Sequence, residues 1–580
     1  MNFIYVPNAI LFGALIAASL LTLVGSPPAS AAVRPQTFCN PLDLPYCFRE
    51  SLPSNREAAD PAILIFKGEY WLFASKSEGY CHSKDFIHWL LVIPTGLPID
   101  QYAPGIVEIA GKLYWNACNT GIYETDDPAA GVWQHVSDTG NHGDPDLFRD
   151  DGGRVYLYSG LSSGGSIGGQ ELDPNNGFKP LTDWISLFSS DVAHYGSQIA
   201  GEPTDVAPYK DSGSWLEGSW MTKHDGKYYL QYAAPGTQWK TYNDGVFVSD
   251  HPLGPFTFAP YSPFSFKPTG FICGAGHSTT FQDFGGRYWH AVTMTISVRA
   301  MFERRLGLFP TWFDIDGQMV CNTYLGDYPQ FAPGVVTDPS NGNSPGWMLL
   351  SYHKPATASS TLDGHPISAA FDEDIRTWWS AATSNPGEWL QVDLGKIVRV
   401  EAAQVNFADQ GSSQVNRMSD GYGYKLDISR DGKAWTTIVD RGVDMRDSPH
   451  DYTQLDQALL GRYVRITNTH SPGGGLFSIS GLRIFGNGLG KAPARAVDLY
   501  VNRDAGDPRQ ATLAWKPVDN ADGYIVRYGI AATKLFNNYQ VYGAATLHMH
   551  TLNVGVPYYF TVVTFNDSGI TKGSKIELAH

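Results

Sequence analysis

A short glycine-aromatic motif recurs five times in the first half of this 580-residue chain. In each copy a glycine is followed closely by aromatic residues and by alternating apolar residues, which predicts a hairpin turn entering a strand. The copies are Gly68-Glu-Tyr-Trp, Gly111-Lys-Leu-Tyr, Gly153-Arg-Val-Tyr, Gly226-Lys-Tyr-Tyr and Gly286-Arg-Tyr-Trp. Repeats of this kind restrict the fold to one assembled from similar β-units.

A second repeated element follows four of the five copies and predicts an outer hairpin. It reads Ser83-Lys-Asp85 leading to Trp89, Thr125 to Trp133, Leu172 to Phe178, and Ser249 to Phe256. Two hairpins make a four-stranded unit, and five such units predict a five-bladed β-propeller. The long insertion at residues 173–214 is expected to map to loops.

The register of the repeats brings acidic residues together. Counting back eight or nine residues from each turn glycine gives Asp60, Ala103, Asp144, Glu217 and His277, all near the start of an innermost strand. Three carboxylates in one channel repel one another, a cost that a purely structural arrangement would avoid. For a single Asp-Pro, turn formation is the better interpretation. For three in register, the pattern favours a functional site.

The composition limits the kinds of molecule that this protein is expected to bind. A formal charge of −16 provides no basic face for phosphates, so nucleic acid is excluded and a neutral substrate is favoured. Aromatic residues make up 13% of the chain, enough for both core packing and stacking on sugar rings. Six cysteines permit disulfides, with Cys39 and Cys47 the pair most easily closed, but buried thiols are an equal alternative.

With the five motifs in order, residues 55–325 resemble glycoside hydrolase family 43. The motifs are Ala59-Asp60-Pro61, Ala103-Pro104, Gly143-Asp144-Pro145, Glu217-Gly218-Ser219-Trp220 and Gly276-His277-Ser278. The resemblance implies that Asp60 is the general base, Glu217 the general acid, and Asp144 the residue that raises the pKa of Glu217. Asp146 is the alternative to Asp144. An inverting reaction predicts that the two carboxyl groups are roughly 6.5–9.5 Å apart, and a retaining one roughly 5 Å.

The sequence also suggests further binding residues. Trp115, Trp220 and Trp239 are candidate stacking platforms. Arg304 is a candidate for a substrate hydroxyl or carboxylate, with an ion-pair role as the alternative. In relatives the position of His277 often holds calcium or water, so His277 is the candidate metal ligand and calcium a possible ion in the channel. Calcium prefers oxygen ligands, and no cofactor is expected to be required.

The N-terminus resembles an export signal. An apolar stretch at residues 9–25 is followed by Ala29-Ser30-Ala31, a small-x-small cleavage pattern. Residues 1–32 are therefore expected to be a signal peptide and the protein secreted or periplasmic, with no membrane insertion after cleavage. The segment lacks Lys and Arg, so an uncleaved anchor is the alternative.

The propeller is predicted at residues 33–335, and two further domains are predicted after it. Thr377-Trp378-Trp379, Trp389 to Gly395 and Arg462-Tyr463-Val464-Arg465 resemble the discoidin or factor 5/8 C-type jelly roll, at residues 349–488. It is expected to bind sugar or to act as a spacer. Residues 495–580 resemble a fibronectin type III domain with an immunoglobulin-like sandwich, on Trp515 and the tyrosine-corner spacing before Tyr558.

The sequence thus predicts an all-β, monomeric, inverting glycoside hydrolase that removes terminal or branching sugars from polysaccharides or oligosaccharides. The sugars left open are β-xylosyl, α-L-arabinofuranosyl, and galactosyl or galactofuranosyl. A non-catalytic sugar-binding or adhesion protein is the alternative.

Overall fold

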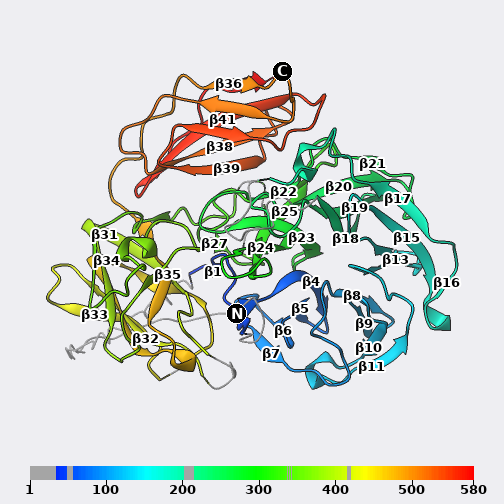
Figure 1. Cartoon of the computed structure of the whole chain (residues 1–580), viewed down its shortest axis with the longest axis horizontal. Helices are drawn as coiled ribbons and strands as arrows, with labels where there is room; N and C mark the ends of the chain where they lie inside the picture. The colour runs from blue at the N-terminus through cyan, green and yellow to red at the C-terminus, as the bar shows by residue number, and fades with distance from the viewer. Residues whose placement is uncertain are drawn as a thin grey trace, which may run out of the picture. The chain divides into compact units, whose positions relative to one another are not determined.

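Five antiparallel sheets follow one another along residues 59–321 of the computed structural model (Figure 1). The structure describes residues 34–48, 56–201, 214–335, 338, 340, 342–413, 420–443 and 445–579. The predicted signal peptide, residues 1–32, lies outside this part. Each sheet contains a run of four strands whose first two are joined at one of the repeated glycines, so the five units predicted from the motif are present.

The strands of the five sheets have the following bounds. The first sheet is β4 (Ala59–Phe66), β5 (Glu69–Ser75), β6 (Tyr80–Ser83) and β7 (Leu90–Val92). The second is β8 (Gly105–Ile109), β9 (Lys112–Asn116), β10 (Ile122–Thr125) and β11 (Gln134–Ser137). The third is β12 (Asp146–Arg149), β13 (Val155–Ser159), β15 (Ser166–Asp173) and β16 (Lys179–Pro180), with β17 (Ile185–Ser189) beside β15.

The fourth sheet is β18 (Trp215–His224), β19 (Lys227–Ala234), β20 (Asn243–Ser249) and β21 (Thr257–Phe258). It gains β14 (Ser162–Ser163) at the edge beside β18, and β22 (Ser265–Phe266) pairs with β20. The fifth is β23 (Cys273–Gln282), β24 (Tyr288–Thr295), β25 (Arg304–Phe313) and β26 (Met319–Cys321). The four outer repeats predicted from sequence lie between the third and fourth strands of sheets one to four, as expected for hairpins.

The first strands of the five sheets close into a ring. β4 contacts β8, β8 contacts β12, β12 contacts β18, β18 contacts β23, and β23 returns to β4. Strand pairing at the beginnings of β4, β18 and β23 is interrupted by register shifts. Such irregularities re-aim side chains and are common beside active sites. Residues at these strand starts therefore face one common centre.

Two short sheets lie outside the five. β1 (Thr37–Phe38) pairs with β27 (Gln330–Phe331), which ties the beginning of the described chain to its middle. β2 (Cys47–Phe48) pairs with β3 (Arg56–Glu57), which immediately precedes β4. All four residues of β2 and β3 are buried.

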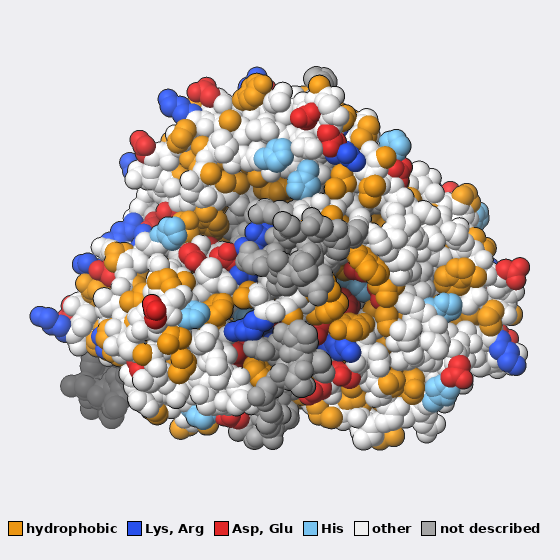
Figure 2. Space-filling model, viewed as in Figure 1, with side chains coloured by type: hydrophobic (Ala, Val, Ile, Leu, Met, Phe, Trp, Pro, Cys, Tyr) orange, Lys and Arg blue, Asp and Glu red, His pale blue; other side chains and the backbone are white. Residues whose placement is uncertain are grey.

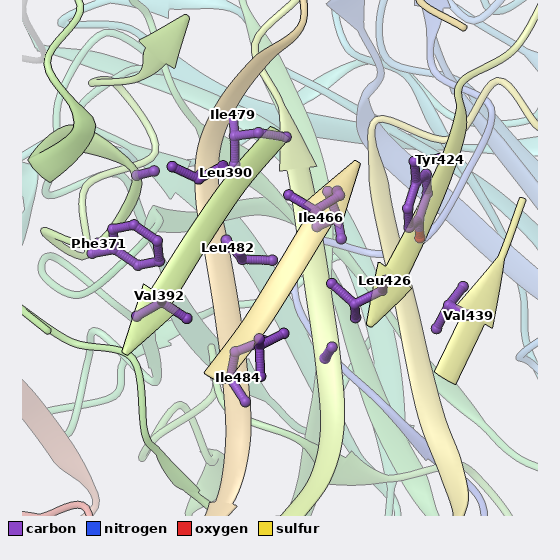
Figure 3. Close-up of a cluster of buried hydrophobic side chains, with 14 of the residues drawn as sticks. Phe371, Leu390, Val392, Tyr424, Leu426, Val439, Ile466, Ile479, Leu482 and Ile484 are labelled. Carbon is purple, nitrogen blue, oxygen red and sulfur yellow. The ribbon is translucent and has the colours of Figure 1, made fainter. Parts of the chain in front are cut away.

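Residues 348–487 form a separate eight-stranded sheet assembly. Its main order is β28 (Met348–Leu349), β35 (Ser478–Asn487), β31 (Trp389–Phe407), β34 (His450–His470), β32 (Gly423–Ser429) and β33 (Trp435–Asp440). β29 (Ala356–Ala358) pairs with β31, and β30 (Trp379–Ser380) pairs with β35. Figure 3 shows how Leu390, Ile466 and Leu482, from three of these strands, point toward one another in its core.

Residues 500–579 form two further sheets. One is β36 (Tyr500–Arg503), β37 (Ala511–Ala514) and β40 (Thr546–Met549). The other is β39 (Asn537–Tyr542), β38 (Gly523–Gly529), β41 (Tyr558–Asn566) and β42 (Gly569–Ile570), with β43 (Glu577–Ala579) beside β41. Trp515 is buried in their shared core, and the backbone N–H of Asn553 donates to the Tyr558 hydroxyl at 3.1 Å. This is the backbone contact expected of the tyrosine-corner spacing.

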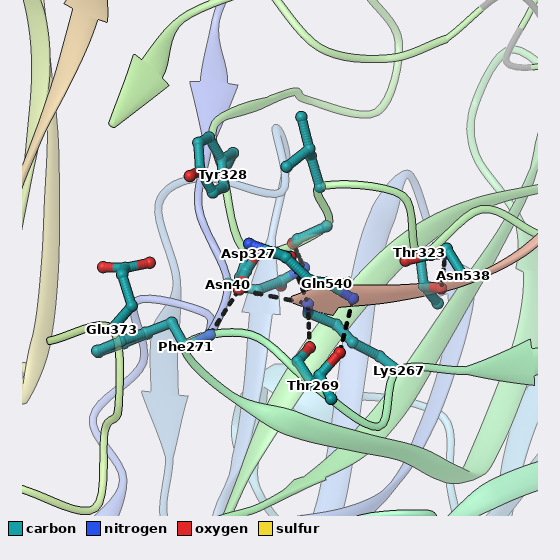
Figure 4. Close-up of polar contacts among 12 residues, drawn as sticks. Asn40, Lys267, Thr269, Phe271, Thr323, Asp327, Tyr328, Glu373, Asn538 and Gln540 are labelled. Carbon is teal, nitrogen blue, oxygen red and sulfur yellow. Dashed lines mark hydrogen bonds and ion pairs between the residues drawn. The ribbon is translucent and has the colours of Figure 1, made fainter. Parts of the chain in front are cut away.

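Residues 36–580 form one compact unit. A buried polar network joins the five sheets, the assembly at residues 348–487 and the two sheets at residues 500–579. Figure 4 shows its centre, where Lys267 Nζ lies 3.3 Å from Asp327 Oδ2 and donates to Gln540 Oε1 at 3.4 Å. Lys267 and Asp327 are buried, and Asp327 Oδ2 also accepts the Phe271 N–H at 2.8 Å. Arg483 of β35 pairs with Glu373 and donates to the Asp327 carbonyl. Buried charges of this kind require such partners.

Helices add little to the architecture. Those in the described ranges include short 3-10 turns such as η1 (Pro128–Ala130) and η6 (Ile367–Ala370), and none found there is long and apolar enough to cross a membrane.

The surface charge is mixed on the face in Figure 2, where Lys and Arg side chains are scattered among acidic ones. This face therefore offers no extended basic surface for a nucleic acid.

We expect Trp115→Ala to lower the free energy of unfolding by about 3–5 kcal/mol, because the side chain is fully buried among the apolar residues of sheets one and two. Urea denaturation measures this. Trp184→Ala is the control, since Trp184 is 42% exposed and its removal should cost less. An unchanged stability combined with weaker sugar binding would contradict the core assignment.

Candidate active site

A cavity of about 280 Å³ lies where the first strands converge. Its wall includes five charged or ionisable residues from the innermost strands and from β25, which are Asp60, Asp144, Glu217, His277 and Arg304. The remainder of the wall includes Tyr102, Leu161, Trp215, Met301 and Phe302. The volume is close to the lower end of the roughly 300–1,000 Å³ range of ligand pockets.

The backbone at the five strand starts has one shared conformation. φ is positive at Asp60 (52°), Ala103 (51°), Asp144 (47°), Gly218 (62°) and His277 (45°). Positive φ is uncommon for residues other than glycine, and such strain gathers at functional sites. The position in the fourth sheet that corresponds to Asp60 and Asp144 is therefore Gly218. The prediction that Glu217 shares this register was wrong by one residue.

Gly218 fits this position for a second reason. A Cβ there would lie 2.7 Å from His277 Cγ, closer than carbon atoms approach without a shift of the imidazole. Glycine therefore lets the fourth and fifth strand starts meet. Glu217, one residue earlier, still reaches the cavity because the strand is irregular between Glu217 and Trp220.

Side chains of neighbouring sheets bind the N–H group of each shared position. Thr293 Oγ1 accepts from Asp60 N–H at 2.7 Å, and Ser75 Oγ from Ala103 N–H at 2.7 Å. Cys118 Sγ accepts from Asp144 N–H at 3.1 Å. The remaining two acceptors are the Asp144 carboxylate, bound by Gly218 N–H at 3.2 Å, and the Asp244 carboxylate, bound by His277 N–H at 2.9 Å. Each bond runs from one sheet to the next around the ring.

Asp60 is held as a carboxylate. Burial opposes its ionisation, but Arg304 Nη1 and His277 Nδ1, each 3.3 Å from Asp60 Oδ1, favour it. Hydrogen bonds from the Ser75 and Thr293 hydroxyls add to this effect. Together these contacts hold the pKa of Asp60 below its ordinary value, so the group is ionised at neutral pH.

Glu217 is held in the opposite state. Burial, followed by the negative charge of Asp144, raises the pKa of Glu217 to about 7. The Tyr242 hydroxyl donates to Glu217 Oε1 at 2.7 Å and moderates the rise. Burial raises the pKa of Asp144 as well, with the nearby charge of His277 opposing it. A buried ionised carboxylate and a partly buried protonated one around a single cavity form an acid-base pair.

Asp144, rather than Asp146, faces this pair. Asp146 is buried and its Oδ2 accepts the Met221 N–H at 3.2 Å, whereas Asp144 lines the cavity. Burial raises the pKa of Asp146 to about 7, which shows that a raised pKa alone does not identify a site residue.

His277 lies among the carboxylates. Burial opposes its charged form, but Asp60, Asp144 and Glu217 outweigh burial and raise its pKa. Its Nδ1 is within ion-pair distance of both aspartates, at 3.3 Å from Asp60 and 3.7 Å from Asp144. Calcium takes six to eight oxygen ligands, which can include waters, and the His277 imidazole is not one of them. Across the described ranges no group of three or more His, Cys, Asp or Glu is arranged for a metal. Calcium in the channel stays a prediction.

The tryptophans chosen from the sequence lie elsewhere. Trp115 and Trp239 are 0% exposed, so no sugar can reach their rings and the prediction that they stack on substrate was wrong. Trp220 is half-buried, packs against the core of sheets one and two, and donates its indole N–H to the Thr280 carbonyl at 3.2 Å. Arg304, in contrast, lines the cavity and pairs with Asp60 and Glu57.

Several cavity residues were missed from the sequence. Trp215 lies two residues before Glu217, and strand periodicity could have placed it on the same side. Tyr102 directly precedes the second register position. Phe302 and Met301 come from the connection between β24 and β25, where no local pattern marks them. Tyr242, which contacts Glu217 from behind the cavity wall, comes from the approach to β20 and was missed as well.

The cysteines serve packing and hydrogen bonding. Cys39 is a buried free thiol, so it is not joined to Cys47. Cys118 lines the cavity and donates its S–H to Asp144 Oδ1 at 3.0 Å. Burial, with the charge of Asp144 next in size, strongly raises the pKa of Cys118, so it is held as a thiol.

Two carboxyl groups in opposite protonation states beside one cavity are what glycoside hydrolysis requires. Residues 54–318 match the family described as glycosyl hydrolases family 43, and residues 355–482 match the F5/8 type C domain. The chain therefore contains a family 43 glycoside hydrolase domain followed by an F5/8 type C domain.

Three relatives show the extent of the similarity. A "Beta-xylosidase" of Xylanibacter ruminicola is 26% identical over 34% of this chain and 77% of its own length. A "Xylan 1,3-beta-xylosidase" of Vibrio sp is 26% identical over 40% of this chain and 46% of that protein. An "Arabinoxylan arabinofuranohydrolase" of Paenibacillus polymyxa is 33% identical over 26% of this chain and 23% of that protein. The chain thus spans less than half of the last two.

We expect Tyr242→Phe to move the alkaline limb of the kcat/KM pH profile to higher pH. The Tyr242 hydrogen bond favours ionised Glu217, so its loss raises the pKa of the acid and keeps it protonated further into the alkaline range. Tyr229→Phe is the matched control. Tyr229 lies in β19 of the same sheet as Tyr242, but its hydroxyl donates to the Gly317 carbonyl, away from the cavity. A limb that stays in place, or moves to lower pH, would contradict this assignment.

Proposed function

We propose that this protein is an inverting exo-acting or debranching glycosidase, with a five-bladed β-propeller as its catalytic domain. The observation that carries the proposal is the opposite tuning of two carboxyl groups, one buried and one partly buried, around one cavity. The contacts of Asp60 lower its pKa, and the surroundings of Glu217 raise the pKa of that group to about 7. The ring formed by the first strands of the five sheets supports the propeller.

In this proposal each carboxyl group has one role. Asp60 draws a proton from the attacking water, and Glu217 protonates the leaving oxygen as the glycosidic bond breaks. Asp144 keeps the proton on Glu217 through its charge and binds the adjacent Gly218 N–H, which fixes the backbone beside the acid. Inversion requires room for water between Asp60 and Glu217, and the stereochemistry of the product tests it.

The cavity walls suggest how a sugar is held. Tyr102 and Phe302 lie side by side, with ring centroids 5.5 Å apart, and Trp215 also lines the wall. Aromatic faces and a buried guanidinium suit a neutral sugar ring with hydroxyl groups. Relatives named for xylosidase and arabinofuranohydrolase activities support β-xylosyl and α-L-arabinofuranosyl substrates, with galactosyl and galactofuranosyl groups as further candidates.

The remaining parts are assigned by the same reasoning. We propose that residues 495–580 are a fibronectin type III spacer, supported by their two sheets and by the Tyr558 contact. Secretion or periplasmic export remains a proposal from the sequence of residues 1–32. A purely sugar-binding protein is disfavoured, because such a protein does not need an acid and a base in opposite states.

We expect Asp60→Asn and Glu217→Gln each to lower kcat on nitrophenyl pentosides by on the order of 10²–10⁴-fold. The two variants should differ on substrates with a better leaving group. Dinitrophenol needs no protonation, so Glu217→Gln should regain much of its rate on dinitrophenyl glycosides, whereas Asp60→Asn should not.

Steady-state kinetics on a pyranoside and furanoside panel, with the product anomer followed by NMR, measures both effects. Asp146→Asn is the control that should retain turnover. Full activity of either catalytic variant, or retention of anomeric configuration, would contradict the proposed mechanism.

A further inference from the structure

Two adjacent pairs of residues link the active site to the F5/8 type C domain. Arg56 and Glu57 form β3, and Arg304 and Arg305 begin β25. Neighbouring residues of a strand point to opposite sides. In both pairs one residue faces the catalytic base and the other faces the F5/8 type C domain.

The inward members form one chain of contacts. Glu57 Oε1 accepts from Arg304 Nη2 at 2.7 Å, and Arg304 Nη1 lies 3.3 Å from Asp60 Oδ1. All three side chains are nearly inaccessible. The position of the Arg304 guanidinium relative to the base therefore depends on β3.

The outward members are held by the F5/8 type C domain. Arg56 donates to Asp409 through Nε at 2.7 Å and to Asp447 through Nη2 at 2.7 Å. Arg305 Nε donates to His450 Nε2 at 2.8 Å, and Arg305 Nη1 donates to the Arg56 carbonyl at 2.8 Å. Arg56 and Arg305 are buried, so these contacts are shielded from water. They fix the two strands relative to each other.

A third contact supports the cavity wall. Arg299 lies over the Trp378 ring at 5.3 Å and donates to the Ala408 carbonyl, both in the F5/8 type C domain. Its Nη1 also pairs with Glu303 at 3.0 Å. Met301 and Phe302, which line the cavity, lie between these two residues of the connection. The F5/8 type C domain thus backs the same side of the cavity that carries Arg304.

We propose that this domain has a catalytic function beyond any binding of sugar: its residues Asp409, Asp447 and His450 are positioning residues that hold Arg304 against the base. The inference rests on the proposed glycosidase function. This positioning role distinguishes the F5/8 type C domain from a simple spacer, because a spacer would not set the geometry of the acid-base pair.

The test compares Asp409→Asn with wild-type protein in the full chain. Asp409→Asn removes one of the two ion pairs of Arg56 and so loosens β3 and with it Arg304. The kcat should therefore fall about 10- to 100-fold, since a misplacement of roughly 1 Å costs on the order of 10² in rate. KM should change little. The acid limb of the pH profile should move to higher pH, because Asp60 loses part of its cationic partner. The other ionisable groups that interact with Asp60 include His277, Asp144, Glu217, Cys118 and Tyr242, none of which is altered in this variant.

Two variants control for a merely structural effect. Asp393→Asn removes a partly exposed ion pair with Arg462 in the same domain and should leave kcat and the pH profile unchanged. Asp409→Glu keeps the charge and should restore most of kcat. An Asp409→Asn protein that folds and retains the wild-type kcat and acid limb would overturn the proposal.

Two outcomes need a second readout. If Asp409→Asn does not fold, Asp447→Asn removes the other carboxylate that holds Arg56, and an unchanged kcat and acid limb would overturn the proposal. If wild-type protein hydrolyses no sugar, the proposed function fails, and NMR titration of the His277 imidazole then compares wild type with Asp409→Asn. Withdrawal of Arg304 should move that titration to higher pH, and identical curves would overturn the inference.

Discussion

The active site depends on a ring of hydrogen bonds between side chains and backbone N–H groups. At the start of each innermost strand the backbone has positive φ, and a side chain from a neighbouring sheet accepts its N–H. Strain of this kind costs on the order of 1–3 kcal/mol at each non-glycine residue, and one hydrogen bond offsets about 0.5–1.5 kcal/mol. The sheets therefore have to be packed together before the strand starts adopt this geometry.

That geometry holds several charged side chains close together around one cavity, where water would otherwise separate them. Asp60, Asp144 and Glu217 are taken out of solvent around one cavity, and His277 and Arg304 supply the compensating positive charge. Because Arg304 lies against Asp60, that carboxylate keeps its charge. Because burial, and after it the charge of Asp144, raises the pKa of Glu217, that group keeps its proton. Distinct protonation states thus arise from position within one small set of side chains.

The sequence predicted the features that repeat and missed those that arise from packing. Five glycine motifs were enough to predict five four-stranded sheets, and register counting found Asp60, Asp144 and His277. It placed Glu217 one residue out of register, because the irregular start of β18 is not visible in spacing. Trp115, in β9, and Trp239, in the connection between β19 and β20, were misassigned because an aromatic residue looks the same in the sequence whether it packs inward or faces a cavity. Tyr242 and Phe302 arrive from connections, and the contacts of Asp409 and His450 join residues 353 and 145 positions apart.

The most direct test of this account is a carboxyl titration of the free protein by isotope-edited NMR, assigned with Asp60→Asn and Glu217→Gln. The account predicts that Glu217 titrates near pH 7 and that Asp60 stays ionised until well below its ordinary pKa. If Asp60 titrated above Glu217, or if both groups were ionised throughout the neutral range, the assignment of base and acid would be contradicted.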